Sequence, residues 1–244
     1  MKVLINYAND LFLRSQKLNS QTGLEVAGFD QVVSFSPRDI DPEFYGANQK
    51  ILSQKRGNGY WLWKPYFIKR MLDKVKMGDY IFYSDSGAYF LQSIDPLIEA
   101  SADSRQDLIC FALHGHVESD WTKRDAFVLM GCDSPGYAST MQRQAGFSLW
   151  RKSKFTLDFI EEYLIFAQDH RILTDIDNQC GLDNYPGFMD HRHDQSILSL
   201  LSKKHGLIAH RDPSQWGDSV MAAYPNSSYG RLIEHTRDRD LAVS

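Results

Sequence analysis

The chain has 244 residues, of which 43% are hydrophobic and 24% are charged, so we expect one large domain or two small ones and not a disordered chain. A formal net charge of -4, with no basic block, argues against a protein that binds nucleic acid, because phosphate neutralisation dominates that affinity. The three cysteines have no C-x-x-C spacing, which argues against a disulfide framework or a cysteine zinc site and indicates a reducing compartment.

The first apolar run, residues 3–7, is too short for a signal-peptide core or a membrane span, and Asp10 and Arg14 follow it closely. No later run approaches the length of a span. We therefore expect a cytoplasmic protein, with a peripheral membrane association left open.

Short apolar runs alternate with amphipathic stretches, which is typical of an α/β domain. Pro65 suits the first turn of a helix, and Gly78 suits the residue just after its end. A polar loop is expected over 174–188, and the chain is read as one domain over 1–225 followed by a polar tail over 226–244. The pattern predicts strands over 3–7, 31–35, 80–83, 107–113, 145–150 and 206–209, and helices over 10–18, 42–54, 65–75, 155–166 and 191–205.

Asp85 comes directly after the predicted strand 80–83, among small polar residues. Ligands of doubly wound sheets bind beyond the carboxyl ends of the strands, so Asp85 is expected at a ligand-binding edge. Its carboxylate can ligate a divalent cation that bridges nucleotide phosphates, with further contacts from Ser84, Ser86 and the backbone of Gly87. The alternative is that Asp85 caps the turn that follows.

The aromatic segment 59–66 precedes the Pro65 helix. Tyr60 and Trp63 can stack on a base or a sugar, and Lys64 can pair with a phosphate. The alternative is a buried aromatic cluster that anchors the helix. Lys64 is the stronger candidate, because lysine is rarely buried without a partner.

Polar residues crowd the predicted start of the helix over 191–205, where the backbone N–H groups favour an anion. The residues concerned are His191, Arg192, His193, Asp194 and Gln195. The alternative is a solvated, capped helix start. The two histidines are one residue apart, so in a helix they diverge and do not share a metal.

Two further positions join the candidates. Lys123 and Arg124 can hold a phosphate or form surface ion pairs. His210 follows the predicted strand 206–209 and so either reaches the same edge as Asp85 or has a structural role. The sequence contains no G-x-S-x-G, no Walker loop and no G-x-G-x-x-G, so serine hydrolases, P-loop NTPases and classical dehydrogenases are not supported.

Over residues 58–210 the chain resembles bacterial glycosyltransferase-like proteins of capsule or lipopolysaccharide assembly, in the nucleotide-diphospho-sugar transferase superfamily with the GT-A fold. The resemblance is carried by the motifs Gly59-Tyr60-Trp61-Leu62-Trp63-Lys64-Pro65, Tyr83-Ser84-Asp85-Ser86-Gly87, Thr122-Lys123-Arg124-Asp125, Tyr185-Pro186-Gly187-Phe188 and His191-Arg192-His193-Asp194-Gln195-Ser196.

The resemblance implies a GT-A domain, a Rossmann-like mixed sheet flanked by helices, whose first strands, ending at Tyr7, bind the nucleotide. It implies that Asp85 is the first aspartate of an Asp-x-Asp motif for Mn²⁺ or Mg²⁺, with Gly87 where the second aspartate is expected. Asp194-Gln195 is similar to the pair beside the anomeric carbon in family-eight-like retaining transferases, which makes His210 a candidate for the later metal ligand.

These features together predict a glycosyltransferase that uses a nucleotide-sugar donor, with UDP favoured, and a glycan or glycolipid acceptor. Two alternatives stay open at this point. One is a metal-dependent sugar-nucleotide hydrolase or phosphoesterase, and the other is a non-catalytic carbohydrate-binding module, which the aromatic content of 13% would suit.

Overall fold

The structure is a computed structural model that describes residues 1–236. A six-stranded sheet lies at its centre, in the order β2-β1-β3-β6-β5-β7, and all neighbours are parallel except those of β6. This confirms the predicted α/β class, with a mixed sheet flanked by helices. The strands are β1 (Lys2–Tyr7), β2 (Gln31–Phe35), β3 (Tyr80–Ser84), β5 (Leu108–Val117), β6 (Met141–Arg151) and β7 (Ala209–His210).

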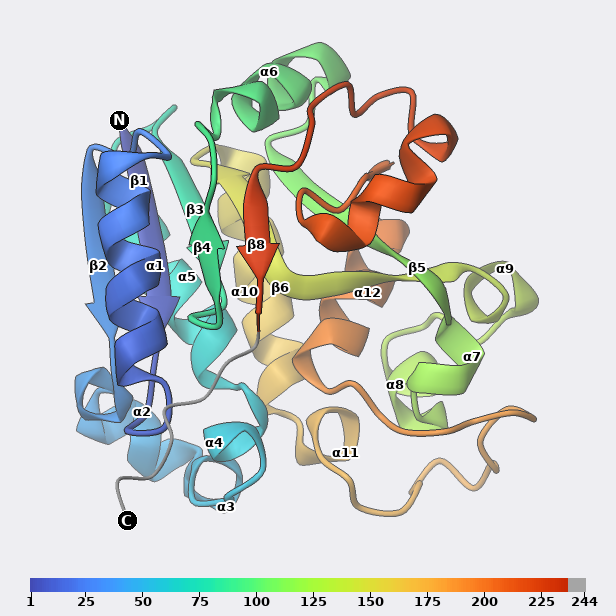
Figure 1. Ribbon diagram of the computed structural model, residues 1–244. Coiled ribbons are helices and arrows are strands. Elements are labelled where there is room, and N and C mark those ends of the chain that lie inside the picture. The colour runs from blue at the N-terminus through green and yellow to red at the C-terminus, as the bar shows by residue number, and fades with distance from the viewer. Residues whose placement is uncertain (237–244) are drawn as a thin grey trace.

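Helices cover both faces of the sheet (Figure 1). On one face, α5 (Trp63–Lys74), α10 (Lys154–Gln168) and α12 (Asp194–Lys204) pack against one another and enclose the larger hydrophobic core. On the other face, α1 (Leu13–Glu25), α6 (Asp95–Ser104) and the two-stranded sheet of β4 (Ala88–Phe90) with β8 (Ile233–His235) enclose the smaller core.

Short elements make the connections between these layers. They are the 3-10 helices η1 (Pro37–Asp39) and η2 (Gln215–Ala223), and the helices α2 (Pro42–Ala47), α3 (Gln49–Leu52), α4 (Gly57–Tyr60), α7 (Glu118–Trp121), α8 (Arg124–Leu129), α9 (Pro135–Ala138) and α11 (His170–Leu173). No helix among residues 1–236 is long and apolar enough to cross a membrane.

Three predicted helices differ from the structure, and the first is the helix expected over 10–18, which is α1 and spans Leu13–Glu25. The helix expected over 42–54 is broken into α2 and α3 at Asn48, which has φ of -114° and serves as the C-cap of the first and the N-cap of the second. The helix expected from residue 191 begins at Asp194, because His193 has φ of 51° and ψ of -119°, which no right-handed helix contains.

The C-terminal segment was expected to be a polar tail from residue 226. Up to Thr236 it is instead part of the fold, since β8 pairs with β4 and the side chains of Tyr229, Leu232 and Ile233 are buried. The remaining part of that predicted tail, residues 237–244, lies outside the described residues.

Candidate functional site

Lys64, Asp85 and Asp194 meet at the carboxyl end of β3, although they come from three separate elements. The Lys64 ammonium lies 2.7 Å from Asp194 Oδ2 and 3.6 Å from Asp85 Oδ1, and it donates a hydrogen bond to the Ala145 carbonyl at 3.0 Å. Tyr83 donates its hydroxyl to Asp85 Oδ1 at 2.6 Å. We call these five residues the Lys64 cluster.

The members of this cluster differ in their access to solvent. The side chains of Lys64 and Asp194 are each 5% exposed, whereas that of Asp85 is 35% exposed. Asp85 is therefore the member that a bound molecule meets first, and Asp194 lies behind it. The prediction that Asp85 lies at the edge of the sheet is confirmed by its position directly after β3.

Burial and charge together set the protonation of the cluster. Burial raises the pKa of Asp194 to about 6, although the Lys64 ammonium opposes that shift. Burial alone would lower the pKa of Lys64, but the two carboxylates outweigh it and raise that pKa. Burial, followed by the Asp85 charge, holds the pKa of Tyr83 well above its usual value, so Tyr83 is a neutral hydrogen-bond donor. The cluster is thus a charged, hydrogen-bonded unit near neutral pH.

A local irregularity in β6 supplies the backbone groups of the site. The pairing of β5 with β6 shifts register between Cys110 and Phe111, which is a β-bulge in the stretch 145–147. There the Ala145 N–H donates to Gln195 Oε1 at 3.3 Å, and the Asp85 N–H donates to the Gly146 carbonyl at 2.7 Å.

Gly146 is required by this close packing. A Cβ at this position would lie 2.8 Å from the side-chain oxygen of Gln144 and 3.3 Å from Asp85 Oδ2. The glycine therefore keeps the space beside the outer oxygen of Asp85 free of side chain.

Gln195 is next to Asp194 and is held in a fixed orientation. Its side-chain NH₂ donates to Gln142 Oε1 at 2.7 Å, and Gln142 in turn donates to Ser196 Oγ at 3.2 Å. Asp194 is held from the other side, because Tyr163 donates its hydroxyl to the Asp194 backbone carbonyl at 3.1 Å. The structure therefore brings together the predicted catalytic pair and Asp85 through Lys64.

An aromatic stack extends the site toward β1. The rings of Tyr7 and Trp63 are stacked at a centroid distance of 3.8 Å, and the Trp63 indole N–H donates to the Gly57 carbonyl at 3.0 Å. Asn58 donates its side-chain amide to the Tyr7 hydroxyl. Burial raises the pKa of Tyr7, so this hydroxyl stays protonated. Trp63 is 5% exposed and Tyr7 is 6% exposed, so the alternative of a buried aromatic anchor describes this pair.

The segment before this stack has an unusual backbone. Five consecutive residues, 57–61, have positive φ values between 52° and 93°, and the Tyr60 and Trp61 N–H groups donate to carbonyls four residues earlier. The three residues that are not glycine are Asn58, Tyr60 and Trp61. Tyr60 and Trp61 each cost about 1–2 kcal/mol in this conformation, which asparagine tolerates better, and such strain is typical of functional sites.

The strained His193 contacts this left-handed turn. Its ring stacks on Trp61 at 5.3 Å and lies 5.0 Å from the ring of Tyr60. The left-handed turn and His193 thus meet through their side chains, and His193 directly precedes Asp194. Asn58 and Tyr83 were not among the predicted site residues. The sequence Gly-Asn-Gly at 57–59 was the available signal for the turn, because glycine and asparagine are the residues that tolerate positive φ.

Lys123 and His191 hold a loop in place and do not contact Asp85 in any hydrogen bond or ion pair of residues 1–236. Lys123 donates its ammonium to the Ile176 carbonyl at 2.6 Å, and its backbone N–H donates to His191 Nδ1 at 3.2 Å. Burial holds the pKa of His191 well below its usual value, so its ring is neutral. Its Nε2 then donates to the Ile172 carbonyl at 2.8 Å.

Arg124 and Arg192 both lie against aromatic rings. The Arg124 guanidinium pairs with Asp133 at 2.9 Å and lies 4.0 Å from the centre of the Tyr185 ring. The Arg192 guanidinium lies 4.2 Å from the Trp121 ring. These contacts connect the 174–188 loop and the start of α12 to the region around α7 and α8.

The remaining candidates flank β3 or lie far from it. Ser84 accepts a hydrogen bond from Asn19 at 2.9 Å, and Ser86 donates to the Tyr7 carbonyl at 2.7 Å, while Gly87 is buried beside β4. His210 is fully buried on β7, three strands away from β3, or roughly 14 Å at the usual strand spacing. The structure therefore does not bring His210 together with Asp85.

The donor set around Asp85 does not fit a resident divalent cation. A divalent cation takes several oxygen ligands, and here the Lys64 ammonium, 3.6 Å from Asp85, already lies between the two carboxylates and repels a second cation. Among residues 1–236, no three His, Cys, Asp or Glu side chains are grouped as metal ligands.

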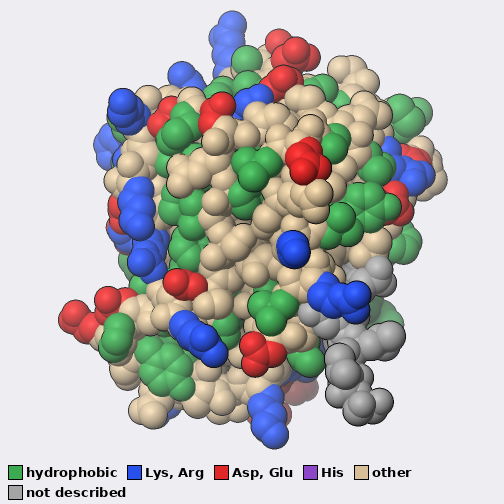
Figure 2. Space-filling view, turned by 60° about the vertical axis from the view of Figure 1, so that its left-hand side comes forward, with side chains coloured by type: hydrophobic (Ala, Val, Ile, Leu, Met, Phe, Trp, Pro, Cys, Tyr) green, Lys and Arg blue, Asp and Glu red, His purple; other side chains and the backbone are tan. Residues whose placement is uncertain are grey.

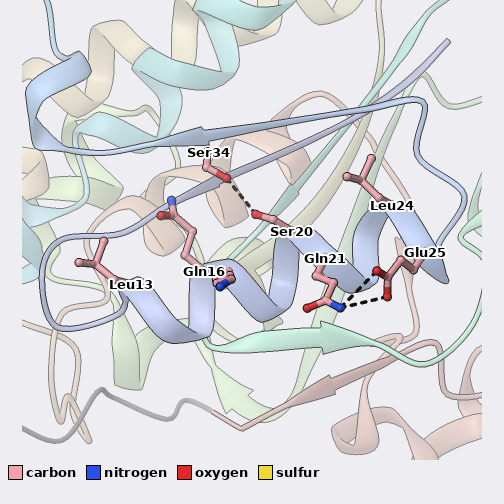
Figure 3. Close-up of a pocket in the computed structure, with 8 residues that line it drawn as sticks. Leu13, Gln16, Ser20, Gln21, Leu24, Glu25 and Ser34 are labelled. Carbon is pink, nitrogen blue, oxygen red and sulfur yellow. Dashed lines mark hydrogen bonds between the residues drawn. The ribbon is translucent and has the colours of Figure 1, made fainter.

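A recess of about 520 Å³ lies elsewhere, between α1 and β2 (Figure 3). Its lining includes Leu13, Leu24, Lys17 and Glu25, and the hydroxyls of Ser20 and Ser34 are hydrogen-bonded to each other at 2.8 Å. With the α1 side of the molecule turned forward, hydrophobic and charged side chains are interspersed on the surface (Figure 2). The recess is wide and shallow and contains no arrangement of groups that suggests chemistry, so the Lys64 cluster is the better candidate site.

Comparisons with known proteins add little at the level of sequence. No protein-family model matches the chain, and no curated protein matches it. Among solved structures, the chain is similar to apo mouse xyloside xylosyltransferase 1, with a TM-score of 0.49 and 11% identity, over 96% of each chain. A likeness this distant carries no conclusion about chemistry, so the function is inferred from the residues of the site.

Proposed function

We propose that this protein is a GT-A glycosyltransferase that moves a sugar from a nucleotide-diphosphate donor, with UDP favoured, to a glycan or glycolipid acceptor in surface polysaccharide synthesis. The observation that carries the proposal is the meeting of Asp85 and Asp194 on the Lys64 ammonium at the carboxyl end of β3. This is the edge of an α/β sheet where ligands bind, and both carboxylates belong to the motifs that resemble glycosyltransferases.

The chemistry requires groups for three tasks. The bond between the anomeric carbon and the diphosphate oxygen breaks with its electron pair left on the diphosphate, a bond to the acceptor oxygen forms, and the proton of the acceptor hydroxyl passes to the departing diphosphate. Positive charge develops on the sugar ring during this exchange. Asp194 is buried and carries negative charge above its pKa of about 6, so it can stabilise that charge or orient the acceptor hydroxyl.

The neighbouring groups position the donor. Asp85 presents its outer oxygen beside Gly146, where it can accept a hydrogen bond from a donor hydroxyl. The Gln195 amide is fixed next to Asp194 by Gln142, which suits a group that orients the sugar. The similarity of Asp194-Gln195 to the family-eight pair favours retention of configuration. Tyr60 is partly exposed, so its ring can stack on the donor.

The first experiment is a thermal-shift panel of UDP, GDP, CDP and their sugars. We expect one nucleotide series to raise the unfolding midpoint, because a ligand stabilises the folded state that binds it. If no nucleotide changes the midpoint while a glycan does, the protein is a carbohydrate-binding module and the proposal is wrong.

The second experiment measures transfer by the Asp85→Asn variant, with Asp103→Asn on the exposed side of α6 as the matched control. Asp85→Asn is expected to abolish transfer and keep the unfolding midpoint within a few degrees, while the control keeps both. Rapid loss of the nucleotide sugar without any acceptor would instead identify a hydrolase.

A further inference from the structure

The Lys64 ammonium lies where a cation between the two key carboxylates would lie. Three oxygen atoms lie around it: Asp194 Oδ2 at 2.7 Å, the Ala145 carbonyl at 3.0 Å and Asp85 Oδ1 at 3.6 Å. The Tyr83 hydroxyl donates a hydrogen bond to that same Asp85 oxygen. Such a set of carboxylate and carbonyl oxygens resembles the ligands of a hard metal ion, but a lysine ammonium lies among them.

The charge balance explains why a positive charge is needed there. Two carboxylates whose oxygens each lie within 3.6 Å of one nitrogen repel each other, and a cation between them offsets that repulsion. Lys64 provides that charge from the first turn of α5, where Pro65 follows it and Trp63 packs against Tyr7. Its position is therefore fixed by a helix in the core.

We propose that Lys64 is the built-in cation of this site, which holds Asp85 and Asp194 together in place of a resident divalent metal ion, and that donor binding does not require such an ion. The second half rests on the proposed function, whereas the first half concerns the cluster itself. Gly87, in place of the second aspartate of the metal motif, agrees with both halves. Lys64 is a positioning residue in this proposal, since its ammonium is already surrounded by protein oxygens.

The first test removes the ammonium and offers a metal. In the Lys64→Met variant the two carboxylates lose their partner, and Mn²⁺ can take its place among the same oxygens. We expect 1 mM Mn²⁺ to raise the unfolding midpoint of this variant by about 5 °C or more, as for a ligand well above its dissociation constant, and to leave the wild type within about 1 °C. No Mn²⁺ response in Lys64→Met would overturn the proposal.

The matched control is Lys203→Met. Lys203 is also a largely buried lysine, and its ammonium lies 2.7 Å from the carboxylate of Glu118, which is its one carboxylate partner among residues 1–236. This variant is expected to lose stability without any rescue by Mn²⁺. An equal rescue of both variants would mean that Mn²⁺ acts non-specifically, and the proposal would fall.

A double variant covers the case in which Lys64→Met does not fold. Adding Asp194→Asn removes one of the two carboxylates, so the double variant is expected to recover stability without metal and to show no Mn²⁺ response. If it folds no better than Lys64→Met alone, the two carboxylates are not what Lys64 holds together.

The second test uses the wild type and calorimetric titration with UDP in EDTA and in 1 mM Mn²⁺. We expect dissociation constants within about threefold of each other. Binding that appears only with Mn²⁺ would overturn the proposal while supporting the transferase. Absence of binding by UDP, GDP and CDP in both buffers would contradict the proposed function, and the Mn²⁺ rescue of Lys64→Met would still decide the role of Lys64.

Discussion

Lys64 and Lys203 are both largely buried and pair with carboxylates, but they lead to different conclusions. The Glu118 cluster, defined as Glu118, Lys203, Thr122, Thr140 and Ser199, is closed. Both carboxylate oxygens of Glu118 accept hydrogen bonds, and the glutamate is 0% exposed. The Lys64 cluster is open, because Asp85 is 35% exposed. A buried ion pair therefore indicates a site only where one of its charged groups still faces solvent.

The largest expected effect on stability lies in the closed cluster. Glu118→Ala leaves the Lys203 ammonium buried without its carboxylate, which costs about 3–5 kcal/mol of unfolding free energy. Chemical denaturation measures this loss. A change below about 1 kcal/mol would show that the closed cluster does not hold α7 and α12 together, and the comparison would fail.

The open cluster is expected to respond in activity. Asp194→Asn removes the negative charge next to the sugar and should lower the transfer rate by roughly 10²–10³-fold, as losses of electrostatic stabilisation do. Denaturation should show a smaller loss of stability than in Glu118→Ala. If the rate is unchanged, Asp194 belongs with Glu118 as a structural carboxylate.

The buried histidine of β7, His210, is expected to set part of the acid sensitivity of the fold, apart from either cluster. Burial lowers the pKa of His210 to about 4, so the folded protein keeps it neutral while the unfolded chain takes up a proton near pH 6.5. The contribution of neutral His210 to the unfolding free energy is fully present above pH 6.5. It is lost as the pH falls towards 4, and about 2 kcal/mol of it is lost at pH 5.

Comparison with a variant isolates this contribution. Asp194 has the opposite sign, because its pKa is raised, and its stabilisation declines as the pH rises towards 6. Wild type and His210→Gln both contain Asp194, so its pH dependence cancels in the difference between their unfolding free energies. Parallel pH profiles for the two proteins would contradict the assignment of His210 as a buried neutral residue.

The smallest expected effect concerns the strained turn beside the open cluster. Asn58→Ala removes the hydrogen bond to Tyr7 and places a less tolerant residue at φ of 53°, which costs about 1–2 kcal/mol. We expect UDP affinity to fall several-fold as well, measured by calorimetry. Arg105→Ala, at φ of 54° at the end of α6, is the control with a similar backbone and no expected change in affinity.

The early part of the fold could be predicted from local sequence. Strands β1, β2 and β3 agree with their apolar runs, and Pro65 and Gly78 flank the helix between them, because each signal depends on a few neighbouring residues. Asp85 was placed at the sheet edge for the same reason.

The pairings within the site could not be predicted in this way. Lys64 meets Asp194 only because α5 and α12 lie on the same face of the sheet, and that is a consequence of tertiary packing. The start of α12 was predicted too early, since the strained backbone of His193 is imposed by its contacts with Trp61 and the Leu173 carbonyl. Lys123 was predicted as a donor-binding residue, but its ammonium donates a hydrogen bond to the loop carbonyl of Ile176, a partner that the sequence does not reveal.

The bulge in β6 has a consequence for how the site can be observed. The Ala145 N–H is bound by the side chain of Gln195 and not by a neighbouring strand, so its exchange with solvent deuterium depends on whether that side chain stays in place. The amide is therefore an internal reporter. Its exchange rate registers any movement of Gln195, including one caused by a bound donor, without a label on the ligand.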